Sequence, residues 1–170
     1  MPGFTESNIT INFPDTNFFR FKNCNGYKAL SGNSFKEMDA CWMDISNNLY
    51  WLIELKDFSA ASLGTPRNVE ERAQNIFKKA VDSLCMFLSC VHNYSYSVNL
   101  CFPSPLPDRL TKFKFITIVH CDSAQLPDVQ LLHNAFRGKF RPYAELFNIK
   151  EYGVIDHNSA IRNMPNNMVS

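Results

Sequence analysis

The chain has 170 residues, which is the size of one ordinary domain. This length is barely enough for one good hydrophobic core, so we expect a single domain. Apolar residues make up 45% and charged residues 19%, which provides a packed core and excludes disorder as the main state. The 17 basic and 16 acidic side chains leave a net charge of +1, without the strong overall field of many nucleic-acid binders. A charged partner must therefore be bound by a local cluster of charged residues and not by the net charge of the protein.

The cysteines and the N-terminal residues indicate a cytoplasmic protein. The six cysteines lack the density typical of a disulfide framework, so we expect them to be reduced. The first residues carry no signal-peptide pattern, and no apolar run approaches the roughly 20 residues that span a bilayer. We therefore predict a cytoplasmic protein with no membrane contact.

The first third of the chain predicts short strands and then a β-hairpin. Residues 8–22 alternate as in short strands, with an opening helix near 15–22 as the alternative. Residues 23–33 are rich in Asn, Gly and Ser and predict a loop. Residues 35–44 and 49–58 indicate two strands, joined by a tight turn at a Ser-Asn-Asn sequence.

The middle of the chain predicts one long helix and one or two strands. Residues 67–91 place apolar side chains three and four positions apart, which is typical of an amphipathic helix. A strand is expected at about 96–102. Residues 113–121 form a continuous β-rich run, of the sort that is buried on both faces of a sheet.

The last third of the sequence predicts a helix, a strand and a flexible C-terminal tail. The helix covers residues 127–138 and ends at Gly138, and a short strand follows at 152–156. We expect a single domain over residues 1–157 and a flexible, Asn-rich tail over 158–170. The order of elements predicts an α/β or α+β fold, with a central mixed β-sheet flanked by helices.

Alternation along the hairpin divides its side chains between two faces. One face is apolar and carries Met38, Ala40, Trp42, Trp51, Ile53 and Leu55. The opposite face carries Glu37, Asp39, Glu54 and Lys56.

The length of the turn decides how the charged residues pair. If Ser46 and Asn47 form the loop, Asp39 lies opposite Glu54. If the loop is one residue further along, Asp39 faces Lys56. Both registers keep the three charged side chains on one face, within about 5 to 8 Å of one another. A three-residue loop would separate them.

Two carboxylates in so small a space repel each other unless a divalent cation lies between them. Mg²⁺ fits such oxygen ligands, with Mn²⁺ as an alternative. A lysine two residues along the same face could hold or help deprotonate a metal-bound water for attack on phosphorus. Asp39, Glu54 and Lys56 therefore suit metal-assisted hydrolysis of a phosphodiester bond.

These residues resemble the PD-(D/E)XK nuclease superfamily, which includes many restriction, repair and defence endonucleases. The resemblance consists of Met38-Asp39, fourteen intervening residues, Glu54-Leu55-Lys56 and the helix that begins near Arg67. It covers roughly residues 35–121 and implies a restriction-endonuclease-like fold, in the order helix, three-stranded meander, helix, strand. It also implies that Asp39, Glu54 and the Leu55 carbonyl bind the metal and that Lys56 is the catalytic lysine.

Several positions depart from the superfamily pattern or extend it. The proline that often precedes the aspartate is replaced by Met38. Many members carry an early acidic residue on an N-terminal helix, for which Glu6 and Asp15 are candidates, while Glu37 could take a similar role beside the metal. Gln74 and Lys78, one turn apart on the long helix, could assist the lysine or simply form a solvated face.

The resemblance implies a metal-dependent endonuclease, with DNA as the expected substrate. A domain of this size has little room for a separate recognition module, so we expect a homodimer or a partner protein that supplies targeting. The alternative is a noncatalytic interaction, immunity or regulatory protein that keeps the same fold. The near-neutral charge supports that alternative.

Two further groups of residues have a functional and a structural interpretation. His120 precedes Cys121 and Asp122 at a strand end, but nothing near it completes a set of nucleophile and base, so a structural role is favoured. Basic residues interleaved with aromatic ones could contact phosphates and unstacked bases, although solvated charges beside a core are the favoured interpretation. These basic residues are Arg109, Lys112, Lys114, Arg137, Lys139 and Arg141.

Overall fold

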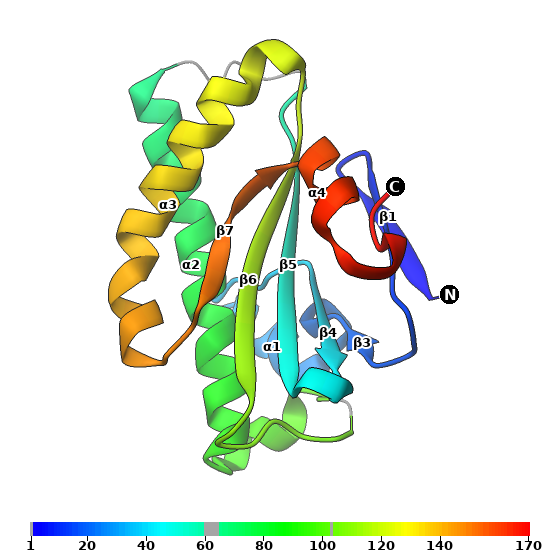
Figure 1. Ribbon diagram of the computed structural model, residues 1–170. Helices are drawn as coiled ribbons and strands as arrows, with labels where there is room; N and C mark the ends of the chain where they lie inside the picture. The colour runs from blue at the N-terminus through cyan, green and yellow to red at the C-terminus, as the bar shows by residue number, and fades with distance from the viewer. Residues whose placement is uncertain (1, 60–64, 103) are drawn as a thin grey trace.

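A five-stranded mixed sheet forms the centre of the molecule in the computed structural model, which describes residues 2–59, 65–102 and 104–170 (Figure 1). The strands follow one another across the sheet in chain order: β3 (Phe18–Phe19), β4 (Ala40–Asp44), β5 (Leu49–Asp57), β6 (Lys112–His120) and β7 (Glu151–Asp156). Strand β4 is antiparallel to both neighbours, whereas β5, β6 and β7 are parallel to one another. The mixed sheet and its helices confirm the predicted α+β class.

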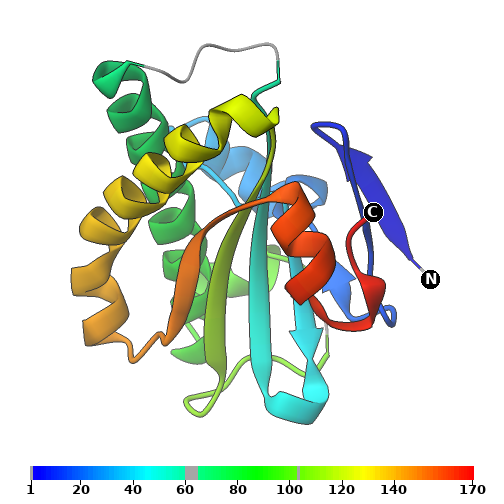
Figure 2. The same cartoon turned by 45° about the horizontal axis from the view of Figure 1, so that its top comes forward.

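Other elements cover both faces of this sheet (Figures 1 and 2). One face packs against α1 (Asn25–Ser31), α2 (Pro66–Val91) and α3 (Leu126–Leu146), and we call the apolar residues between them the first core. The opposite face packs against α4 (His157–Asn163) and the hairpin of β1 (Gly3–Glu6) and β2 (Ile9–Asn12), which enclose the second core. Within the described ranges, the fold also contains 3₁₀ turns at Phe21–Asn23, Ile45–Asn47, Ser95–Asn99, Ser123–Gln125 and Pro165–Asn167.

The long helix predicted from apolar spacing is α2, which connects β5 to β6. It begins where the Thr65 side chain accepts a hydrogen bond from the backbone N–H of Asn68 at 3.3 Å, with Pro66 in the first turn. Helices α2 and α3 connect the parallel strands and lie side by side on one face of the sheet. Strand β5 is therefore covered on both sides, which explains its nearly continuous apolar sequence.

The register between β4 and β5 is the one that places Asp39 opposite Glu54. Cα pairing runs from Ala40 with Ile53 to Asp44 with Leu49. The connection is the 3₁₀ turn Ile45–Asn47, in which the Asp44 side chain accepts a hydrogen bond from the Asn47 backbone at 3.2 Å. Asn48 closes the turn with φ 47°, a left-handed conformation that asparagine tolerates.

The first predicted strand of the hairpin is too long at its start. Strand β4 begins at Ala40, and the preceding residues run along α2 instead. The backbone N–H of Lys36 donates to Asp82 Oδ2 at 2.8 Å, and that of Met38 donates to Ser83 Oγ at 2.9 Å. Because these amides bind helix side chains, Met38 packs in the first core rather than on the apolar face predicted for it.

Three other segments differ from the sequence prediction. The predicted loop at 23–33 contains α1, and the predicted strand at 96–102 is largely the 3₁₀ turn Ser95–Asn99. Helix α3 continues past Gly138 to Leu146, because its buried stripe continues at helical spacing. That stripe consists of Val129, Leu132, Phe136, Phe140 and Ala144.

The C-terminal residues are part of the domain, in contrast to the predicted flexible tail. The Asp156 side chain caps α4 by accepting a hydrogen bond from the Ser159 backbone at 2.9 Å. Met168 and Val169 are buried in the second core. Ser170 and Thr10 exchange two backbone hydrogen bonds of 3.0 Å, which tie the chain end to β2. The boundary predicted at residue 157 is therefore wrong.

Candidate active site

Two carboxylates from neighbouring strands converge on one ammonium group. Asp39 directly precedes β4, and Glu54 lies in β5 on the face covered by α2. Lys79 Nζ of α2 lies 3.2 Å from Asp39 Oδ1 and 2.6 Å from Glu54 Oε1. Glu54 is completely buried and Asp39 is 8% exposed. The two carboxylates thus form a buried position for a cation, as their alternation and register predict.

Lys56 connects this buried pair to the surface. Its Nζ lies 2.5 Å from Glu54 Oε1, and its side chain is 31% exposed. The structure therefore brings together all three residues predicted to be catalytic. Lys56 is the more exposed of the two lysines on Glu54.

Backbone contacts hold Asp39 in place. The Leu55 N–H donates to Asp39 Oδ2 at 2.8 Å, and Arg20 Nε donates to the Asp39 carbonyl at 2.7 Å. The Leu55 carbonyl, predicted to bind metal, accepts a hydrogen bond from Ser7 Oγ at 3.2 Å. The turn between β1 and β2 therefore reaches the edge of β5 beside the carboxylate pair.

Burial shifts the acid–base properties of the site. Burial, followed by the charge of Asp39, raises the pKa of Glu54 from 4.5 to about 7, although Lys79 and Lys56 oppose the shift. Burial is also the main cause that raises the pKa of Glu37 to about 7. Burial alone would lower the pKa of Lys79, but Glu54 and Asp39 outweigh it and raise that pKa. Lys79 is therefore a firmly charged cation between two acids.

Glu37 lies near the pair but does not contact Lys79 directly. It is 8% exposed, and its Oε2 has no hydrogen-bond partner among the described residues. The charges of Asp39 and Lys79 both influence its pKa, which places it within electrostatic reach of the site. Among the described residues, no ion pair joins Glu37 to Lys79 and no third acidic side chain completes a metal-binding group with Asp39 and Glu54, so the role of Glu37 beside a metal stays a prediction.

The structure places neither of the two helix residues that could assist the lysine, Gln74 and Lys78, in contact with the carboxylate pair. Gln74 is exposed, and Lys78 forms an ion pair at 2.7 Å with the buried Asp82, which also accepts a hydrogen bond from the Lys36 backbone. Lys79 points to the sheet instead and was not predicted. The sequence gives one indication of this orientation. Lys79 lies three residues after Ile76 and four before Ser83, and both of these are buried on the face of α2 that packs on the sheet.

The two candidates for an early acidic residue lie in different places. Glu6 forms ion pairs with Arg20 and with Lys22, and Arg20 in turn binds the Asp39 carbonyl. Glu6 is therefore connected to Asp39 through Arg20. Asp15 accepts a hydrogen bond from Trp42 Nε1 at 3.0 Å, at the second core on the other face of the sheet.

The other functional interpretations gain no support from the structure. His120 Nδ1 lies 3.3 Å from Asp57 Oδ1 at the ends of β5 and β6, so its partner is neither Cys121 nor Asp122. Most of the predicted basic set is engaged singly with neighbouring side chains. These contacts join Lys114 to Glu151, Lys139 to Glu70, Arg141 to Glu145 and Arg137 to the ring of Tyr152.

The carboxylate oxygens of Asp39 and Glu54 suit a hard divalent cation, but the Lys79 ammonium competes for the same position. Carboxylate oxygens are the ligands that Mg²⁺ prefers, and Asp39 and Glu54 present them to a common point. Among the described residues, no group of three or more His, Cys, Asp or Glu side chains could hold a metal ion. The ammonium of Lys79 fills the point between the carboxylates, so a metal ion would have to displace it.

Comparisons with known proteins assign no family to this chain. No family model, curated protein or solved structure matches it. None of the helices in the described ranges combines the length and apolarity needed to cross a bilayer. The functional conclusion therefore depends on the geometry of Asp39, Glu54, Lys56 and Lys79.

Proposed function

We propose that this protein is a metal-dependent nuclease that hydrolyses phosphodiester bonds, with DNA as the expected substrate. One observation carries the proposal: the carboxylates of Asp39 and Glu54 contact the same cationic nitrogen, at 3.2 and 2.6 Å, beside Lys56. A buried position of this kind favours a cation over any neutral group. A hard divalent cation in place of the ammonium would have the oxygen ligands it prefers.

Each residue has a role in this proposal. Asp39 and Glu54 would hold Mg²⁺, or Mn²⁺, and the Leu55 carbonyl has a second lone pair with which to join them. The metal would supply Lewis-acid activation of the phosphate and of a water molecule. Lys56, at the partly exposed edge of the pair, would orient the attacking water. Lys79 would move aside when the metal binds.

The order of the elements supports the same proposal. The strands β3, β4 and β5, the helix α2 and the parallel strand β6 follow in the order that the resemblance to PD-(D/E)XK nucleases implies, with α1 inserted between β3 and β4. The β1–β2 hairpin stands where the resemblance implies an opening helix. Because the domain is small, we further propose that a second copy or a partner protein supplies targeting.

A noncatalytic role is the second candidate, and Lys79 is the observation that favours it. Its ammonium contacts both carboxylates and compensates their charge without any metal. In that case the cluster is a buried ion network that stabilises the fold. The protein would then act through its surface, as an immunity or regulatory protein does.

A cleavage assay on Lys56→Met separates the two candidates. Methionine keeps the length of the side chain but removes its charge, so we expect Mg²⁺-dependent cleavage of DNA to fall by about 10²- to 10⁴-fold. The assay compares single- and double-stranded DNA and RNA in Mg²⁺, in Mn²⁺ and in EDTA. Lys28→Met is the matched control, because Lys28 is exposed on α1. No cleavage by wild type in either metal would support the noncatalytic role, and equal cleavage by Lys56→Met and wild type would contradict the role proposed for Lys56.

A further inference from the structure

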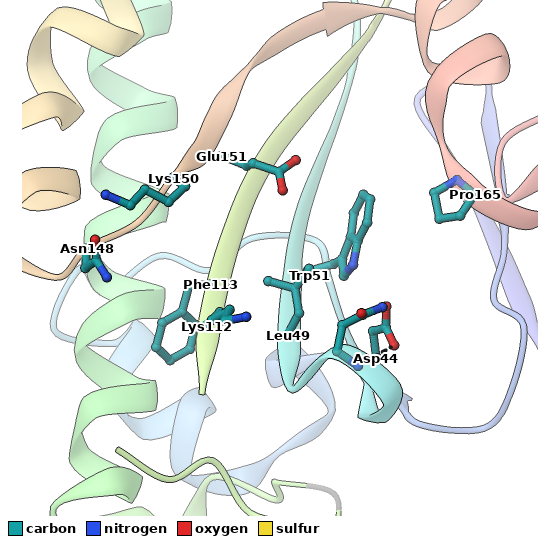
Figure 3. A pocket seen from close by; sticks show the side chains of 10 residues that line it. Asp44, Leu49, Trp51, Lys112, Phe113, Asn148, Lys150, Glu151 and Pro165 are labelled. Carbon is teal, nitrogen blue, oxygen red and sulfur yellow. Dashed lines mark hydrogen bonds between the residues drawn. The ribbon is translucent and has the colours of Figure 1, made fainter. Parts of the chain in front are cut away.

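Two thiols lie close together outside the candidate active site, whereas the charged groups of the pocket in Figure 3 do not converge. This pocket has a volume of about 570 Å³ and lies where β5, β6 and β7 begin, and the side chains of its Lys112 and Lys150 point away from each other (Figure 3). The two thiols belong to Cys24, which directly precedes α1, and to Cys101, which lies between α2 and β6. Both are free cysteines in the structure, and neighbouring free thiols can be joined by oxidation.

The Cys24 sulfur lies beside the backbone of Cys101. Cys24 Sγ donates a hydrogen bond to the Leu100 carbonyl oxygen at 3.1 Å. One peptide bond joins that carbonyl to Cys101, so standard bond lengths place its oxygen about 2.8 Å from Cys101 Cα. The Cys24 sulfur is therefore at most about 6 Å from Cys101 Cα. The two thiols also interact with each other, because burial and then the Cys101 thiol raise the pKa of Cys24 to about 12.

Close packing of α1 against the turn Ser95–Asn99 holds the two cysteines in this arrangement. The Tyr96 hydroxyl donates a hydrogen bond to the Gly26 carbonyl at 2.9 Å. A Cβ atom at Gly26 would lie 2.3 Å from the Asn99 carbonyl oxygen, so glycine is what allows the helix to approach so closely. Leu100 is buried in the first core and anchors the chain directly before Cys101. The thiols are therefore kept near each other without a covalent bond.

The two cysteines differ in exposure, and this difference assigns them different roles in an oxidation. Cys101 is exposed, whereas Cys24 is 2% exposed. Oxidants react first with accessible thiols, and a neighbouring thiol can then resolve the oxidised sulfur. Cys41 also lies within electrostatic reach of Cys24, but it is completely buried. Cys101 is therefore the thiol that an oxidant meets, and Cys24 is the thiol beside it.

We propose that Cys24 and Cys101 form a reversible disulfide when the protein meets a peroxide. Hydrogen peroxide would oxidise the Cys101 thiol to a sulfenic acid, with release of one water molecule. The Cys24 sulfur would then bond to the Cys101 sulfur, and the sulfenic hydroxyl group would leave as a second water molecule with the Cys24 proton. The two thiols together lose two electrons and two protons, which reduce the peroxide. A dithiol reductant would restore both thiols by exchange.

The disulfide should stabilise the folded protein. It would join two residues that are 77 positions apart in the sequence, and a cross-link of this span restricts the unfolded chain. The melting temperature should therefore rise by about 5 to 10 °C after oxidation and return to its original value after reduction. Cys101→Ser should show no such rise.

Peptide mapping of the peroxide-treated protein tests the proposal. Free thiols are alkylated before digestion with trypsin and chymotrypsin, which separate Cys101 from Cys85 and Cys90. We expect a peptide containing Cys24 to be linked to one containing Cys101, and the link to disappear after treatment with dithiothreitol. Cys85→Ser is the control, because Cys85 is also an exposed cysteine, and this variant should form the same link.

Cys24→Ser provides a second, independent arm of the same test. Without Cys24, the sulfenic acid of Cys101 should persist and be trapped by dimedone. The proposal is overturned if peroxide leaves both thiols of the wild type open to alkylation, if it converts Cys101 to a sulfinic acid without a cross-link, or if it joins Cys24 to Cys41. None of these outcomes bears on cleavage, which depends on Lys56.

Discussion

Replacing Lys79 with methionine should lower the free energy of unfolding by about 3 to 5 kcal/mol and make stability depend on divalent cations. The substitution leaves Asp39 and the completely buried Glu54 without the cation that they share. The two carboxylates repel each other, and burial has removed the water that would solvate their charges. Together these effects lower the free energy of unfolding by more than a typical surface substitution does. Mg²⁺ can then bind without competition from the ammonium and restore part of the loss.

Urea unfolding at pH 8, with Mg²⁺ or with EDTA, measures both effects. Arg67→Met is the control on the same helix, because Arg67 pairs with Glu71 and their side chains are 87% and 60% exposed. An exposed pair of this kind contributes less than about 1 kcal/mol. Mg²⁺ should stabilise Lys79→Met more than wild type. If Lys79→Met is as stable as Arg67→Met and does not respond to Mg²⁺, the carboxylates form no cation site.

Stability should fall as the pH rises from 5 to 8, and Glu54→Gln should remove much of that fall. The pKa of Glu54 is raised from 4.5 to about 7, so the folded protein favours the protonated carboxyl. The resulting stabilisation is fully present below pH 4.5 and is lost as the pH passes 7, a change of roughly 3 kcal/mol at most. Glutamine resembles the protonated acid and does not titrate.

Chemical denaturation at pH 5, 6, 7 and 8 checks this expectation. Wild type should keep the larger slope, and Glu54→Gln should keep the smaller slope that Glu37 contributes, since its pKa is also raised to about 7. Glu145→Gln is a suitable control, because Glu145 is an exposed residue of α3 paired with Arg141. Identical pH profiles for wild type and Glu54→Gln would contradict the raised pKa.

Much of the sheet and the centre of the site follow from local patterns. Strands β5 and β6 have long buried runs of mostly apolar residues, and a strand covered on both sides has that composition. Alternation places Asp39 and Glu54 on one face for either two-residue loop. The structure selects the register in which they lie opposite each other.

What the sequence does not reveal depends on tertiary packing. Lys78 and Lys79 are both polar residues of α2, and only the rotation of the helix against the sheet turns Lys79 inward and Lys78 outward. Met38 leaves the predicted strand because Ser83, 45 residues away, accepts its N–H. Met168 lies in a mostly polar stretch of the sequence, and its burial results from packing in the second core. Contacts of this range leave no local periodic signal.

A crystal structure of the protein soaked in Mn²⁺ is the most direct test of the proposed metal site. Manganese takes oxygen ligands as magnesium does, and its anomalous scattering identifies it. We predict one peak at coordination distance from the carboxylates of Asp39 and Glu54, with the Lys79 ammonium moved away from the position it holds here. No peak at this position, with Lys79 still bound to both carboxylates in a preparation that cleaves nucleic acid, would contradict the proposed site.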